Sequence, residues 1–72
     1  MLRAAMDDAR GELEAAEDEA RQDAASLRQR SRRLRLRGFG QLADELEAHA
    51  VALTETADAI VAVLESVPLP SA

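Results

Sequence analysis

The side chains that could carry out chemistry in this chain are few, and the single histidine comes first. The sequence has no cysteine, lysine, tyrosine or tryptophan, and His49 alone ordinarily titrates near neutral pH. Glu45 stands four residues earlier on the same helix face, so the two could form half of a metal site that a second chain completes. In di-iron helix bundles glutamate and histidine stand three residues apart, a position that Leu46 occupies here. We interpret His49 as a polar position that fixes helix pairing, and we expect no enzyme activity, cofactor or metal.

A run of arginines is the second feature with chemical potential. Six of the nine arginines stand between residues 28 and 37, directly before a Gly-Phe-Gly break at 38–40. Guanidinium groups pair with carboxylates or phosphates, but the chain carries fourteen Asp and Glu and a net charge of −5. A net acidic chain without aromatic side chains among its arginines is a poor general nucleic-acid binder. We expect carboxylate pairing by five of these residues: Arg28, Arg32, Arg33, Arg35 and Arg37.

Length and composition indicate a helical protein that needs support beyond its own core. A domain of 72 residues covers its apolar surface poorly, and with no cysteine it has no disulfides. Alanine, leucine, glutamate and arginine dominate, and Phe39 is the only aromatic residue, which is typical of long helices and coiled coils. Oligomerisation or a partner chain is therefore the expected source of additional stability.

The first helix is expected from residue 2 to about residue 36. Its acidic residues gather between 7 and 23 and its arginines between 28 and 37, so the helix has an acidic half and a basic half. Glu17 and Arg21 have the favourable spacing for an ion pair. The apolar stripe follows heptad steps but takes one extra step of four residues near its middle, a stutter. The expected stripe consists of Leu2, Met6, Ala9, Leu13, Ala16, Ala20, Ala24, Leu27, Ser31 and Leu34.

The turn is expected at residues 37–40. Gly38 suits the left-handed position that follows a helix carboxyl end, and Gly40 could cap the start of the next helix. Phe39, between them, would plug the end of a helix bundle or, alternatively, would be an exposed anchor for a partner.

The second helix is expected from about residue 41 to residue 66 and carries the larger apolar load. Pro68 restricts Val67 and ends the helix, and residues 68–72 are expected to form an extended tail. Apolar residues fall on three adjacent heptad rows of this helix. The rows are Phe39, Leu46, Leu53, Ile60 and Val67; Leu42, His49, Thr56 and Val63; and Ala43, Ala50, Ala57 and Leu64.

Together these elements predict an all-α fold: a two-helix antiparallel hairpin of about residues 2–36 and 41–66, within a domain of residues 1–67. About seven to nine residues of the first helix would extend beyond the second. Because a lone helix pair buries one face of each helix, we expect two hairpins to form a four-helix bundle, or one hairpin to dock on another helical protein. Residues 7–23 of one copy would then face the arginines of an antiparallel second copy. The expected interface residues are Leu13, Leu27, Leu34, Phe39, Leu42, Leu46, Leu53, Ile60, Val63 and Leu64.

The function that this fold favours is a non-enzymatic helical interaction or assembly module. One alternative is a secreted hairpin of the small dimeric type that Gram-positive secretion systems export, although Phe39-Gly40-Gln41 stands where that class has a Trp-x-Gly turn. Another alternative is an arginine-rich nucleic-acid-binding or antitoxin-like regulator. The sequence shows no hydrophobic leader and no run of about 20 apolar residues, so we expect a cytoplasmic protein, with leaderless secretion left open.

Overall fold

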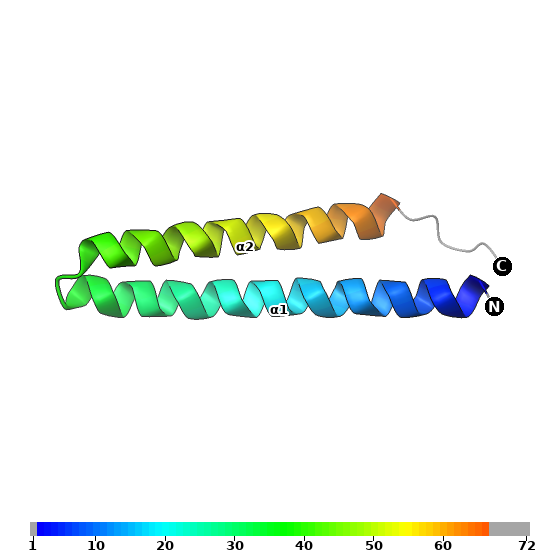
Figure 1. Cartoon of the computed structure of the whole chain (residues 1–72), viewed down its shortest axis with the longest axis horizontal. Helices are drawn as coiled ribbons and strands as arrows, with labels where there is room; N and C mark the ends of the chain where they lie inside the picture. The colour runs from blue at the N-terminus through cyan, green and yellow to red at the C-terminus, as the bar shows by residue number, and fades with distance from the viewer. Residues whose placement is uncertain (1, 67–72) are drawn as a thin grey trace.

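Two α-helices joined by a tight turn form the part of the chain that the structure describes, as the sequence predicts. The computed structural model describes residues 2–66, with side chains from residue 4 onward. Helix α1 spans Leu2–Leu36 and helix α2 spans Gly40–Ser66, and they lie side by side in antiparallel directions (Figure 1). The predicted hairpin is therefore confirmed, with α2 beginning one residue earlier than expected. The expected tail at 68–72 lies outside the described residues, as does Val67.

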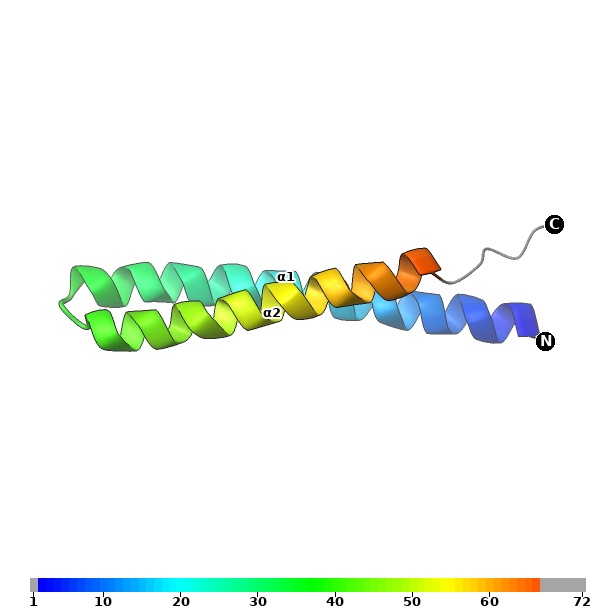
Figure 2. The ribbon, with the colours of Figure 1, turned by 90° about the horizontal axis from the view of Figure 1, so that it is seen from above.

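The hairpin is a rod, not a globule. Its Cα radius of gyration is 16.7 Å and its extents are 57 × 16 × 13 Å, whereas a compact chain of this length would have a radius of gyration of about 11 Å. With 35 residues against 27, the amino-terminal turns of α1 extend beyond the end of α2, as predicted (Figure 1). The two helices cross near the middle of the rod (Figure 2). Each helix can therefore bury only the stripe that faces its neighbour.

The turn depends on a glycine in the left-handed region. Gly38 has a φ of 90°, and two backbone bonds close the helix around it: the amide of Phe39 donates to Leu34 O at 2.9 Å, and that of Gly38 to Arg35 O at 3.1 Å. This pair of bonds satisfies the last carbonyls of α1, as predicted for Gly38. The cap predicted for Gly40 is wrong. The amide of Ala43 donates to Phe39 O at 3.0 Å, so Phe39 holds the cap position and Gly40 is already helical.

A single register runs along the whole hairpin. At the turn end, the Ser31 hydroxyl donates to Ala43 O at 2.8 Å, and at the open end Arg10 Nη2 donates to Leu64 O at 3.1 Å. Arg10 and Ser31 are 21 residues apart in α1, and Ala43 and Leu64 are also 21 residues apart in α2. Each separation equals three heptads. The repeat therefore continues without a slip between these two bonds.

Only small side chains are fully buried between the helices. The described residues include no large side chain with less than 2% of its surface exposed. Small side chains let two helices approach closely, but each one removes much less apolar surface from water than a leucine does. We call the following set the small-residue seam: Ala20, Ala24, Ser31, Ala43, Ala50 and Ala57.

The predicted stutter in α1 is wrong, because two long polar residues occupy the packed stripe. Ala9 and Ala16 are exposed, whereas Arg10 and Glu17 are half-buried. The stripe that faces α2 thus runs through Arg10, Leu13, Glu17 and Ala20 in unbroken heptad steps. Long polar side chains can do this because their aliphatic stems cover the neighbouring helix while their charged ends reach water.

The third heptad row of α2, the alanine row, faces α1 most directly. Ala43, Ala50 and Ala57 are each 0% exposed. The row of Leu46, Leu53 and Ile60 is half-buried beside it. The remaining predicted row is exposed and does not pack against α1. It consists of Leu42, His49, Thr56 and Val63.

Gly38→Ala should destabilise the hairpin, because an L-residue in the left-handed region costs about 1–2 kcal/mol, offset by roughly half a kcal/mol of reduced chain entropy. Gly40→Ala is the matched control. Its φ is not positive and an added Cβ would meet nothing within 4 Å, so it should be neutral or stabilising by about 0.5–1 kcal/mol. Denaturant unfolding of both variants measures the difference, and equal midpoints would contradict the left-handed assignment.

Ala50→Leu should lower the free energy of unfolding by about 1–3 kcal/mol, because an enlarged side chain in a closely packed position forces the helices apart. Ala48→Leu introduces the same side chain two residues away at an exposed position and should change stability by less than about 0.5 kcal/mol. Denaturation midpoints of the two variants give the comparison. If Ala50→Leu were the more stable of the two, the close approach of the helices would be wrong.

Candidate interaction surface

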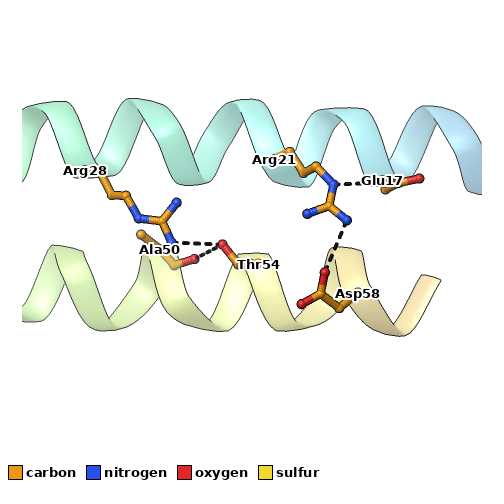
Figure 3. A network of polar contacts seen from close by, with 6 residues as sticks. All are labelled: Glu17, Arg21, Arg28, Ala50, Thr54 and Asp58. Atoms are coloured by element: carbon orange, nitrogen blue, oxygen red, sulfur yellow. Dashed lines mark hydrogen bonds and ion pairs between the residues drawn. The ribbon is translucent and has the colours of Figure 1, made fainter. Parts of the chain in front are cut away.

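One side of the hairpin is joined by polar contacts between the helices. Arg21 Nε donates to Glu17 Oε2 at 2.9 Å, which confirms the predicted ion pair within α1, and its Nη2 donates to Asp58 Oδ1 of α2 at 3.2 Å (Figure 3). These hydrogen bonds, first to Glu17 and then to Asp58, raise the pKa of the Arg21 guanidinium above its ordinary value. The guanidinium bridges the two helices from the solvent side.

Arg28 repeats this arrangement one step of seven residues along α1. Its Nη2 donates to Thr54 Oγ1 at 3.1 Å, and the Thr54 hydroxyl in turn donates to Ala50 O at 3.0 Å (Figure 3). Thr54 is half-buried, so the contact covers the edge of the small-residue seam. The carboxylate partner predicted for Arg28 is replaced within the hairpin by a hydroxyl.

Arg35 completes the series near the turn. Its Nη2 lies 2.8 Å from Asp44 Oδ1 and 3.3 Å from Glu47 Oε2, so Arg35 pairs with two carboxylates of α2. The hydrogen bond to Asp44 is the main cause of a raised pKa for the Arg35 guanidinium. We call the side of the hairpin that carries these three arginines and their α2 partners the ion-paired side.

The opposite side of the hairpin is apolar and open. Ala43 faces α1, so its two neighbours in sequence project about 100° to either side of that direction. Asp44 binds Arg35 on the ion-paired side, and Leu42 therefore projects to the other side. The same holds two heptads further along α2, where Ala57 is flanked by Asp58 on the ion-paired side and Thr56 on the other.

Four of the six large apolar side chains that are exposed among the described residues lie on this open side, and the other two are Leu36 and Val51. Phe39 is 53% exposed, Leu42 50%, Val63 48% and Met6 38%. Half of Phe39 is thus uncovered, and in the single hairpin it does not close the end as a plug would. Half-buried leucine and isoleucine side chains beside the small-residue seam also border the open side. The open side comprises Met6, Leu13, Leu27, Leu34, Phe39, Leu42, Leu46, His49, Leu53, Thr56, Ile60 and Val63.

Two grooves lie on the open side, one near each end of the hairpin. The groove at the turn end has a volume of about 410 Å³ and combines guanidinium groups with an apolar floor. The groove at the other end has a volume of about 230 Å³ and is almost entirely apolar. The first is lined by Arg30, Arg33, Leu34, Arg37 and Leu46, and the second by Met6, Ala9, Arg10, Leu13 and Leu64.

The structure places the predicted charge-pairing residues in different surroundings. Arg35 pairs with carboxylates inside the hairpin, and among residues 4–66 the ion pairs use only Arg35 and Arg21 as cations. Arg33 and Arg37 line the turn-end groove instead, and Arg32 is exposed. Their pairing with carboxylates of another chain stays a prediction.

His49 is an exposed residue on the open side, and Glu45 is exposed as well. Within the part of the chain that the structure describes, no three histidine or acidic side chains lie close enough together to hold one metal ion. Neither α1 nor α2, over their described lengths, has a stretch long and apolar enough to cross a lipid bilayer.

Sequence reasoning missed three residues that tie the helices together: Arg10, Thr54 and Asp58. Arg10 donates to Leu64 O, one of the last carbonyls of α2, where a cation also complements the helix dipole. Asp58 and Thr54 lie three and six residues beyond the positions of α2 that are as far from Gly38 as Arg21 and Arg28 are. The long arginine side chains reach them because helical side chains tilt toward the amino terminus of their helix. Comparison with protein-family models, curated proteins and solved structures finds no match for this chain.

Proposed function

We propose that this chain is a non-enzymatic helical interaction module that self-associates through its open side into a four-helix bundle. The observation that carries the proposal is the asymmetry of the hairpin. Arginine bridges cover one side of the small-residue seam, and the other side exposes large apolar residues near both ends of the hairpin, with His49 and Thr56 between them.

The angular arrangement of α2 supports a bundle. In a four-helix bundle each helix contacts two neighbours in directions roughly at right angles, and a third row of side chains points between them to the centre. The alanine row of α2 contacts α1. The row of Leu42 and Val63 projects about 100° away, and the row of Leu46, Leu53 and Ile60 lies between the two. The three rows therefore match one intramolecular neighbour, one intermolecular neighbour and a shared core.

The burial pattern supports the same conclusion energetically. Full burial of a leucine, valine or phenylalanine side chain contributes about 1.5–3 kcal/mol relative to exposure, and the single hairpin does not fully bury any of these among its described residues. A small domain without disulfides has few other sources of stability. Covering the open side with a second apolar surface would supply this contribution.

A second candidate function rests on the turn-end groove. Three guanidinium groups, those of Arg30, Arg33 and Arg37, line one concave surface, and such a cluster could bind the phosphates of a nucleic acid. Retention on nucleic acid that weakens steeply with salt would support this candidate. Equal passage of the protein through nucleic-acid and blank columns at low salt would remove it.

Size-exclusion chromatography with light scattering tests the proposal. The wild type should have twice the mass of the 7.8 kDa chain. Leu42→Asp should weaken the dimer at least about 100-fold, because each dimer loses two buried leucines worth about 1.5 kcal/mol or more apiece. Leu42 is 50% exposed in the hairpin, so the substitution leaves the contacts with α1 in place.

Val51→Asp is the matched control. Val51 is 47% exposed, nearly the same as Leu42, but it follows Ala50 in sequence and therefore projects to the ion-paired side. This variant should remain dimeric. A folded wild-type monomer would contradict the proposal, as would equal effects of the two substitutions.

A further inference from the structure

We propose that the open side is covered by a second copy of this chain in the antiparallel orientation, with the two turns at opposite ends and the twofold axis at the level of Val51 on α2. This inference rests on the proposed self-association and adds its orientation and register. Two independent features of the hairpin, the apolar rows of α2 and the charges of α1, lead to the same axis.

The apolar rows of α2 select the register. With the axis at the level of Val51, antiparallel α2 helices place Phe39 level with Val63 of the second copy, and Leu42 level with Ile60 of the second copy. Each layer then joins one residue from the row of Phe39, Leu46, Leu53 and Ile60 to one residue from the row of Leu42, His49, Thr56 and Val63. The two inner layers place Leu46 with Thr56 and His49 with Leu53 of the second copy.

A shift of one heptad in either direction leaves large apolar residues uncovered. Moving the axis by one heptad toward the carboxyl end of α2 places Phe39 and Leu42 level with positions beyond Ser66, where α2 of the second copy ends. Moving it toward the turn places Ile60 and Val63 level with positions before Gly40, where α2 of the second copy begins. The register centred on Val51 is the one that covers all four of these residues, of which Phe39, Leu42 and Val63 are about half exposed in the single hairpin.

The charges of α1 fit the same axis. Residues equally far from Gly38 lie close to one level of the hairpin, so the axis that passes Val51 of α2 passes Ala25 of α1. Arg33 is then level with residue 17 of the second copy, two residues from Glu19. Helical side chains tilt toward the amino terminus of their helix, and this tilt brings the long Arg33 side chain closer to Glu19 of the second copy.

Arg30 also lies near a carboxylate of the second copy. It is level with Ala20 of the second copy, which is three residues from Asp23 of that copy. Within one chain, Arg30 and Asp23 are seven residues apart, so both project in the same direction from α1. Arg30 and Arg33 both line the turn-end groove, whose volume of about 410 Å³ is open on this side. The acidic side chains of the second copy would therefore enter a groove lined with arginines and floored by Leu34 and Leu46.

The opposite orientation, with both turns at one end, places like charges together. Residues 28–47 carry six arginines against three acidic residues, Asp44, Glu45 and Glu47, so the turn end of each hairpin is net positive, and the two turn ends would meet in this orientation. The acidic residues between 7 and 23 would gather near Glu55 and Glu65 at the other end. Like charges at an interface suppress an orientation even when its apolar contacts are adequate. The charge distribution therefore favours the antiparallel dimer.

The test uses two single variants, Arg33→Glu and Glu19→Arg, first apart and then mixed. Each alone places like charges at both symmetric contacts and should raise the dimer Kd by about 10-fold. In an equal mixture, the heterodimer restores opposite charges at both contacts. It should reach roughly nine-tenths of all dimers by native mass spectrometry, against one half for random pairing, if each homodimer is about 10-fold weaker.

The chain offers a matched control. Arg32→Glu and Asp18→Arg change the same charges with the same spacing, one residue earlier in each case. Arg32 and Asp18 project toward the ion-paired side, so their mixture should show close to random pairing. Arg33 and Glu19 are fourteen residues apart on one helix, about 21 Å, so a rescue cannot occur within one chain.

The outcomes separate this inference from the proposed function. Preferential heterodimers of the Arg33→Glu and Glu19→Arg chains, together with near-random pairing of the control chains, would support the antiparallel register. A stable dimer in which both mixtures pair alike would overturn the register and leave self-association intact. A monomeric wild type would overturn both.

Discussion

Close packing of small side chains is the constraint on which the rest of this structure depends. Ala24 and Ala50 are buried, and Ser31 donates its hydroxyl proton to Ala43 O at 2.8 Å, so the two helix backbones approach without a large side chain between them. The leucines that accompany these residues in the heptad pattern are displaced to the edges of the contact. Small side chains let the two helices pack closely, but they leave most of the large apolar side chains at the edges of the contact, partly exposed to solvent.

The two edges of that contact differ in chemistry, and the proposed self-association rests on this difference. On one edge, Arg21, Arg28 and Arg35 recur every seven residues and bridge to acidic or hydroxyl groups of α2. On the other edge, no such bridge occurs among the described residues, and the apolar rows remain open. A monomer in water gains little from this asymmetry, whereas an assembly needs one polar outer side and one apolar inner side.

Much of the architecture could be predicted from the sequence, because heptad spacing and Gly38 specify two helices and the turn between them. The Glu17–Arg21 pair also followed from spacing alone. The packed face of each helix was harder to predict. Apolarity alone ranks Ala16 above Glu17, yet Glu17 packs against α2, since its stem covers the neighbouring helix while its carboxylate reaches Arg21. On α2, three adjacent rows were comparably apolar, and only the register set by the turn assigns the alanine row to α1.

Thermal unfolding over a dilution series tests the central claim, that the hairpin is stable only when its open side is covered by a second copy. Circular dichroism at 222 nm would follow the helices while the protein concentration falls 100-fold. If a second copy covers the open side, Tm falls by roughly 5–10 °C over this range, because unfolding is coupled to dissociation of a dimer. A cooperative transition whose Tm does not change with concentration would contradict it.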